Sequence, residues 1–278
     1  MALIFDEIGY WSEIKLEIIE KYAREYSKIL TNQKKPELHH VYIDAFAGSG
    51  KHISRTTGES VRGSPQIALD IDPPFREYFF IDIDGHKVAE LNRIVASRPE
   101  AHVLHGDCNS LLITEVFPSV RYEDYRRGLC LLDPYGLDLK WKVVQTAGRM
   151  KSIDMFLNFP VMDINRNVLW TNPEGVDEAD VSRMDDFWGD GSWNKAAYRL
   201  TPNLFGEVVG IKEDNRAFAL AFGKRLNEVA GFKYVSHPLP MRNSKGATVY
   251  YLFFASQKRV ADDIIRHIFN KYLNWGIK

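Results

Sequence analysis

The chain has 278 residues, of which 45% are hydrophobic, enough for one large α/β domain or two small ones with a real core. Its 36 lysine and arginine side chains balance 37 aspartates and glutamates, so no global basic field draws it to nucleic acid, although a local patch stays open. The N-terminus carries acids where a signal peptide needs positive charge, and no apolar run approaches the ~18 residues of a membrane span. We therefore expect a cytoplasmic protein with no membrane contact.

The two cysteines and eight histidines give no sign of a metal site. Cys108 and Cys130 do not form a C-x-x-C pair, and the histidines show neither an H-E-x-x-H pattern nor a cysteine–histidine spacing. We therefore predict no metal. A reducing compartment is the simplest interpretation of this cysteine usage.

The chain begins with a long amphipathic helix, expected over 10–30, where aromatic and aliphatic side chains recur at near-helical spacing. Apolar runs of strand length follow at 41–46, 78–83, 101–105, 129–133 and 153–159. Helical stretches fall between them, at 65–71, 85–98, 109–117 and 140–150. Ser64 is a good N-cap for the first of these, with Pro65 at the first helical position. This βαβα alternation predicts a doubly wound parallel sheet with helices on both faces.

The C-terminal part indicates a different end to the sheet. A helix at 211–229 leads to a strand near 232–238, and a short loop at 242–246 gives another strand at 248–256 before a final helix over 258–274. Two strands joined so closely must be antiparallel. A mostly parallel, seven-stranded sheet that ends in an antiparallel hairpin is characteristic of the Rossmann-like fold of class I methyltransferases, and this is the fold we expect.

We expect residues 1–278 to form a single domain of this kind with two elaborations. Residues 1–40 form an N-terminal helical extension. The segment 160–210 is polar and tryptophan-rich, and it follows the fifth strand. Because ligands lie at the carboxyl ends of such strands, we predict a lid or substrate-binding region there, whose aromatic side chains pack a small core of their own. Asn165 and Arg166 are its best polar contacts for a substrate, since arginine offers a forked donor for phosphate or carboxylate.

The stretch DAFAGSGK at 44–51 looks at first like a phosphate-binding loop. The pattern G-x-x-x-x-G-K-[ST] would need a glycine at Ala45 and a hydroxyl at His52, and both positions are wrong. A nucleotide hydrolase that uses Lys51 is therefore disfavoured.

Counted from Asp44, the same stretch reads D-x-x-x-G-x-G, in which Gly48 and Gly50 free the backbone to turn tightly under a ligand. It resembles the S-adenosylmethionine loop of class I methyltransferases, in the D-x-F-A-G-S-G variety found among enzymes that modify nucleic-acid bases. The resemblance implies that Asp44, Phe46, Gly48 and Gly50 contribute to a cofactor site.

The second and third strands end in acids. Asp82, with Ile83 beside it, lies where the two hydroxyls of an adenosine ribose are held in related folds. Asp107, followed by Cys108, is placed to receive the adenine amino group. Dinucleotide binding would require a third small residue at Ile53. These positions therefore favour S-adenosyl-L-methionine over a dinucleotide.

The fourth strand ends in Asp133-Pro134-Tyr135-Gly136, the most informative stretch of the chain. It resembles the Asp-Pro-Pro-Tyr loop of amino-group methyltransferases, and more closely the Asp-Pro-Phe-Gly of tRNA guanine N2-methyltransferases. The resemblance implies that Asp133 and the Pro134 carbonyl accept hydrogen bonds from the target amino group, while Tyr135 covers a planar acceptor. Such acceptors work by positioning, so these three are the expected catalytic residues.

Taken together, the chain resembles the three-Cys-motif partner (TcmP) family, a bacterial group with a class I methyltransferase-like domain. The stretches that carry this likeness are DAFAGSG at 44–50, GSPQIAL at 63–69, FFIDID at 79–84, LLDPYGL at 131–137 and NFPVMDINRN at 158–167. The family name implies a partner protein with three cysteines, similar to radical S-adenosylmethionine proteins. It supplies no acceptor.

One segment departs from the ordinary methyltransferase pattern. Residues 51–63 separate the glycine loop from the next helix, where only a few residues are usual. We therefore expect that helix to be displaced from the cofactor carboxylate, with Lys51 or Arg62 serving instead.

Two functions stay open at this stage. The first is an S-adenosylmethionine-dependent methyltransferase acting on a nitrogen of a nucleobase or a nucleotide-like acceptor. The alternative is a cofactor-binding partner of the three-cysteine protein that no longer transfers methyl groups.

Overall fold

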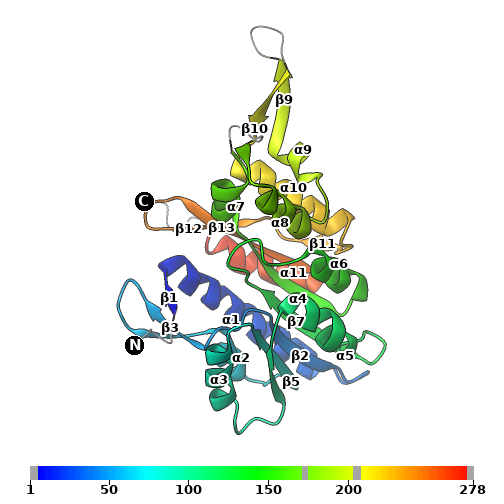
Figure 1. Ribbon diagram of the computed structural model, residues 1–278. Coiled ribbons are helices and arrows are strands. Elements are labelled where there is room, and N and C mark those ends of the chain that lie inside the picture. The colour runs from blue at the N-terminus through cyan, green and yellow to red at the C-terminus, as the bar shows by residue number, and fades with distance from the viewer. Residues whose placement is uncertain (1–5, 171–174, 203–207, 274–278) are drawn as a thin grey trace.

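The computed structural model describes residues 6–170, 175–202 and 208–273. These residues build a mixed α/β fold around one large, mostly parallel sheet with helices on both faces (Figure 1). The fold class expected from the sequence is confirmed at this level.

Eight strands form the large sheet in the described part of the chain. They are β2 (His39–Asp44), β5 (Glu77–Asp82), β6 (Ala101–His105), β7 (Arg126–Leu132), β8 (Ile153–Phe159), β11 (Tyr234–Val235), β12 (Leu239–Arg242) and β13 (Thr248–Ser256). The order across the sheet is β6-β5-β2-β7-β8-β13, and both β11 and β12 pair with the outer edge of β13. The first five of these strands are parallel, whereas β13 is antiparallel to β8 and to the two short strands.

The sheet has eight strands in place of the seven expected because two short strands precede β13: β11 lies within the predicted 232–238, and β12 follows directly after that range. Pro238 lies between β11 and β12, and it has no backbone N–H to donate to a ladder. The chain therefore leaves the edge of β13 after Ser236, whose N–H still donates to the Phe254 carbonyl, and rejoins it at Leu239.

Each face of the sheet is covered by its own helices and its own apolar cluster. One face is covered by α1 (Tyr10–Asn32), α2 (Ser64–Leu69), α3 (Gly85–Ile94) and α11 (Arg259–Asn270). The other face is covered by α4 (Cys108–Leu111), a π-helical turn η1 (Leu112–Val116), α5 (Phe117–Ser119), α6 (Trp141–Met150) and α10 (Asn215–Glu228). The helix predicted at 109–117 runs without a break from Cys108 to Ser119, with a π-helical turn in its middle. The cap of α2 also differs from the prediction, because Gly63 is the N-cap and Ser64 is the first helical residue.

The order of the strands defines one special edge. After β2 the chain builds β5 and β6 on one side, and then crosses over to build β7 and β8 on the other. The carboxyl ends of β2 and β7 therefore flank a topological switch point, which is where open α/β sheets bind ligands.

A small three-stranded sheet, not predicted from the sequence, lies beside this edge (Figure 1). It consists of β1 (Asp6–Ile8), β3 (Lys51–Ser54) and β4 (Ser60–Arg62). The hairpin β3–β4 is the segment that follows the glycine loop, and β1 pairs with β3 in parallel. The hydroxyl of Ser54 donates a hydrogen bond of 2.7 Å to the Glu13 carboxylate of α1, which fixes the hairpin to the body of the protein.

The segment 160–210 begins with α7 (Val161–Asn167), α8 (Glu178–Trp188) and α9 (Trp193–Ala197). It ends in the strand β9 (Tyr198–Pro202), which pairs with β10 (Val208–Lys212) as an arm that extends away from the large sheet (Figure 1). Residues 171–174 and 203–207 of this segment lie outside the described residues.

The aromatic side chains of this segment do not form a core of their own, contrary to the prediction. Phe187, Trp188 and Trp193 are buried in the same cluster as the side chains of β8 and α10. Trp188 stacks on Phe218 of α10 with ring centroids 5.1 Å apart. The segment is therefore anchored on the main core, close to the carboxyl edge of the sheet.

Candidate active site

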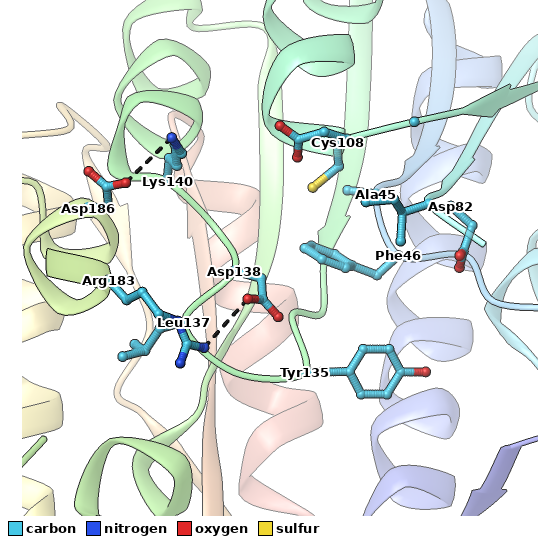
Figure 2. A pocket seen from close by; sticks show the side chains of 13 residues that line it. Ala45, Phe46, Asp82, Cys108, Tyr135, Leu137, Asp138, Lys140, Arg183 and Asp186 are labelled. Carbon is cyan, nitrogen blue, oxygen red and sulfur yellow. Dashed lines mark ion pairs between the residues drawn. The ribbon is translucent and has the colours of Figure 1, made fainter. Parts of the chain in front are cut away.

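Two neighbouring cavities open at the carboxyl ends of the parallel strands. The first cavity has a volume of about 420 Å³ and is lined by Ala45, Phe46, Asp82, Ile83, Gly106, Asp107, Cys108, Tyr135, Leu137, Asp138, Lys140, Arg183 and Asp186 (Figure 2). The second cavity has a volume of about 250 Å³, and its walls come from β1, α1, the glycine loop and the ends of β7 and β8. Phe46 and Tyr135 line both cavities, so the two are adjacent.

The first cavity brings together five of the predicted cofactor residues. Phe46 follows β2, Asp82 and Ile83 end β5, and Asp107 and Cys108 follow β6. The Ile83 side chain is 74% exposed and offers an apolar surface at the mouth of the cavity. These residues meet because three adjacent parallel strands end at the same edge.

Asp82 holds the glycine loop. One oxygen of its carboxylate accepts a hydrogen bond of 2.8 Å from the backbone N–H of Gly48, and the other accepts one of 2.8 Å from the N–H of Asp84. A carboxylate has about four acceptor sites, so two remain for donors in the cavity. Asp82 thus links the end of β5 to the loop after β2.

The glycine loop has the conformation that its sequence suggests. Gly48 and Gly50 have φ angles of 64° and 78°, in the left-handed region that other residues rarely adopt. The first turn of the loop is buried, since Ser49 is only 1% exposed. Gly48 lines the second cavity, whereas Gly50 lies behind the loop against Ile94.

The expectation that residues 51–63 displace the following helix is wrong. The β3–β4 hairpin leaves the glycine loop and returns to it, because the N–H of Gly63 donates a hydrogen bond of 2.8 Å to the carbonyl of Gly50. Helix α2 therefore begins directly beside the loop. Arg62 pairs with Asp70 at 2.8 Å, and neither Arg62 nor Lys51 lines either cavity.

Asn109 was not predicted, yet it ties together two loops of the first cavity. Its backbone N–H and its side-chain amide both donate to Asp107, at 3.0 and 2.9 Å. The same side chain donates to the Asp138 carbonyl at 2.8 Å and accepts from the Lys140 N–H at 2.7 Å. The loop after β7 is thereby held against the end of β6. Burial raises the pKa of the neighbouring Cys108 thiol to about 12, so this thiol is a packing group and not a nucleophile.

Asp133 faces the second cavity and is paired with a lysine from α1. The ammonium of Lys15 contacts Asp133 Oδ2, and the side chain of Lys15 is 8% exposed. Lys15 Nζ also lies 5.5 Å from the centre of the Tyr250 ring of β13. The sequence held a signal for this residue, since Lys15 falls among Trp11, Ile18 and Tyr22 on the apolar stripe of the helix, where a lysine is out of place.

Asp44 lies beneath this pair and lines neither cavity. It is fully buried, and its Oδ2 has no hydrogen-bond partner within the described residues. Burial raises the pKa of Asp44 to about 7, and the nearby charge of Asp133 adds to this effect. Asp44 is therefore close to its titration point at neutral pH and supports the site from below.

Tyr135 lines both cavities and is hydrogen-bonded to a residue of β1. Its hydroxyl donates a hydrogen bond of 3.0 Å to Asp6 of β1, and Lys87 of α3 pairs with the same carboxylate at 2.7 Å. The side chain of Tyr135 is nevertheless 72% exposed, so a planar molecule can reach its ring. Pro134 lines the second cavity beside Asp133.

The predicted substrate residues of segment 160–210 lie elsewhere. Asn165 donates a hydrogen bond of 2.8 Å to Asn215, Arg166 is exposed, and neither lines a cavity. The part of the segment that does reach the first cavity is α8, through Arg183 and Asp186 (Figure 2). These side chains point toward the loop after β7, where they pair with Asp138 at 3.6 Å and with Lys140 at 3.4 Å.

Two further observations concern the described residues only. No group of three or more histidine, cysteine, aspartate or glutamate side chains among them is arranged to hold a metal ion. None of the helices in that part of the chain is both long and apolar enough to cross a membrane.

Comparison with solved structures identifies similar folds. A Legionella pneumophila protein of family DUF519 is 11% identical, with a TM-score of 0.54 over 94% of this chain and 92% of that one. A candidate methyltransferase from Thermobifida fusca is 10% identical, with a TM-score of 0.44 over 89% and 80% of the two chains. The 23S rRNA methyltransferase ErmE is also 10% identical, with a TM-score of 0.35 over 94% and 79%. Because the last two TM-scores are below 0.5, only the first similarity supports the fold.

No family model matches the chain, and no curated protein matches it. The likeness to the TcmP family therefore rests on the sequence motifs alone.

Proposed function

We propose that this protein is an S-adenosylmethionine-dependent methyltransferase that methylates an amino nitrogen of a nucleobase or of a nucleotide-like acceptor. The observation that carries this proposal is the position of Asp133. It faces the second cavity, which is large enough for an acceptor group, and the larger first cavity adjoins it across Phe46 and Tyr135.

The first cavity fits the cofactor. Its volume of about 420 Å³ lies in the range of small-molecule sites, which is ~300–1,000 Å³. Asp82 has two acceptor sites left for the hydroxyls of a ribose, and Asp107 stands at the far end for an adenine amino group. Ile83 and Leu137 provide apolar surface for the adenine ring. The glycine loop, with Gly48 on the wall of the second cavity, suits the amino-acid end.

The cofactor, when bound, supplies a methyl group on a positively charged sulfur. Transfer from such a group needs little acid–base help, so the task of the protein is to hold the nucleophile in line. In the described structure, the Asp133 carboxylate is bonded through Oδ2 to Lys15. This contact fixes the carboxylate plane and leaves Oδ1 to accept an N–H of the acceptor. The Pro134 carbonyl can accept the second N–H, and Tyr135 can cover the ring.

A transfer assay tests the proposal. Protein incubated with tritium-labelled cofactor should label a nucleic-acid fraction of a cell extract in preference to its protein fraction. Asp133→Ala should lower this labelling by roughly two orders of magnitude, the scale of a positioned polar group, while calorimetry shows unchanged affinity for S-adenosylhomocysteine. If S-adenosylhomocysteine binds and no fraction is ever labelled, the alternative function, a non-catalytic partner of a three-cysteine protein, is favoured. If it does not bind at all, both functions are excluded.

A further inference from the structure

Asn158 is a polar residue on the wall of the second cavity. Asn158 is the last residue but one of β8, the strand beside β7. Leu132 and Leu157 are partners in the parallel register, so Asp133 and Asn158 are the next pair toward the edge of the sheet.

Asn158 points to the same face of the sheet as Asp133. Alternate side chains of a strand share a face, and Leu131 and Phe156, two residues earlier, both pack in the cluster under α1. Asn158, Asp133 and Lys15 of α1 accordingly all line the second cavity.

The amide of Asn158 is unsatisfied. The residue is 6% exposed, and within the described part of the chain its Oδ1 has no hydrogen-bond partner. Buried amide groups are nearly always paired, because an unpaired one loses its hydration with nothing in return. Asn158 lies between Asp133 at the end of β7, which is already paired with Lys15, and Leu252 of β13, and neither of these neighbours pairs with its Oδ1. An unpaired amide on the wall of a cavity therefore indicates a ligand that pairs with it.

We propose that Asn158 is a substrate-binding residue that reads the ring edge beside the methylated amino group. This inference rests on the proposed function and adds to it a residue that recognises the acceptor. An amide carries a donor and an acceptor side by side, and the edge of a nucleobase offers the complementary pair next to its amino group. With the amino group on Asp133, the amide of Asn158 contacts the adjacent ring atoms. An aliphatic amine, such as a lysine side chain, has no such edge, so the acceptor is an amino-bearing heterocyclic base.

Calorimetry on three proteins tests this inference. The wild type, Asn158→Leu and Thr31→Val are each titrated, in the presence of S-adenosylhomocysteine, with the 5′-monophosphates of adenosine, cytidine and guanosine and with a lysine peptide. The wild type should bind at least one nucleotide and not the peptide, and Asn158→Leu should bind that nucleotide at least tenfold more weakly. Affinity for S-adenosylhomocysteine should stay within twofold in all three proteins.

Thr31→Val is the matched control, because Thr31 Oγ1 is also buried without a partner and lies outside both cavities. Both substitutions remove an unpaired polar group, so both should leave Tm equal or higher, but only Asn158→Leu should lose the nucleotide. Equal nucleotide affinity in Asn158→Leu, or binding of the peptide alone, overturns the inference. Loss of nucleotide binding in Asn158→Leu, together with no methyl transfer by the wild type, would refute the proposed function and leave Asn158 as a residue that binds a nucleobase without methylation.

Discussion

The backbone N–H of Gly48 donates a hydrogen bond of 2.8 Å to the carboxylate of Asp82, 34 residues further along the chain. This bond joins the loop after β2 to the end of β5, and it links Asp82 on the wall of the first cavity to Gly48 on the wall of the second. An acid expected to contact only a ligand is therefore also part of the framework that shapes the proposed cofactor site.

The first prediction concerns this bond. In Asp82→Asn, an amide NH₂ replaces one of the two oxygens that accept the N–H groups of Gly48 and Asp84. Hydrogen bonds to charged groups contribute ~1.5–3 kcal/mol, so affinity for S-adenosylhomocysteine should fall roughly 10- to 100-fold in calorimetry. Asp84→Asn is the control, because Asp84 only caps α3 through the His86 N–H and asparagine caps equally well. Unchanged affinity in Asp82→Asn would show that the bond does not shape the site.

Much of the fold is readable from the sequence because the parallel strands are apolar on both sides. β7 and β8 are buried almost throughout, and their sequences predict them to within a few residues. The hairpin β3–β4 could not be predicted, since residues 51–62 are polar and carry no apolar alternation. It is held by pairing with β1 and by the Ser54–Glu13 bond, which are contacts between distant parts of the chain.

The same contrast applies to the site. Phe46, Asp82 and Asp107 were predictable because each directly follows or ends a strand at one sheet edge. Asn165 and Arg166 were misplaced because the position of a helix after the fifth strand does not determine which of its sides faces the cavity. Lys15 was predictable only in part. Its place on the apolar stripe of α1 is visible in the sequence, but its pairing with Asp133 is not, because the two residues are 118 positions apart in the chain.

The second prediction concerns Lys15. Lys15→Met keeps the length of the side chain and removes the cation from Asp133, which is then left facing the cavity without its partner. Methyl transfer should fall at least tenfold, because the carboxylate is no longer held in one plane, while affinity for S-adenosylhomocysteine stays within twofold. Lys21→Met on the same helix is the control, since Lys21 is exposed and pairs with Glu17.

Stability gives an independent measurement of the same pair. Removing one partner of a buried pair is costly, although Asp133 is partly open to solvent, so the loss should be below the ~3–5 kcal/mol of a fully buried pair. The double variant Lys15→Met/Asp133→Asn should recover part of this loss in urea denaturation.

If Lys15→Met has full transfer activity, Lys15 has no role in positioning the acid.

The third prediction is a pH dependence of stability. Burial raises the pKa of Asp44 from 3.8 to about 7, so the folded protein binds a proton that the unfolded chain has lost. The resulting stabilisation is fully present below about pH 4 and is lost as the pH rises through 7. As the pH rises from 5 to 8, the free energy of unfolding of Asp44→Asn should therefore increase relative to that of the wild type by an amount on the order of 1–3 kcal/mol.

Urea denaturation of both proteins without cofactor, at four pH values, measures this difference directly. Asp154 is also buried, and its pKa is raised to about 6, but it is present in both proteins and its effect cancels. Asp70→Asn, at an exposed position, should show no such trend. If the difference in the free energy of unfolding between Asp44→Asn and the wild type stays constant across this range, Asp44 of the folded protein does not titrate between pH 5 and pH 8.

The last prediction concerns the point where the hairpin returns to the glycine loop. A Cβ at Gly63 would lie 2.8 Å from the carbonyl carbon and oxygen of Gly50, and backbone atoms cannot move aside as the end of a side chain can. Gly63→Ala should therefore push α2 and the hairpin away from the loop and break the bond from the Gly63 N–H to the Gly50 carbonyl. Strain of this kind typically costs ~1–3 kcal/mol, and affinity for S-adenosylhomocysteine should fall with stability, since the loop forms a wall of the site. Gly191→Ala, where the nearest atom is 3.6 Å away, should leave both quantities close to wild type. Equal stability and affinity in Gly63→Ala would mean that the hairpin does not need this close approach to place α2 beside the loop.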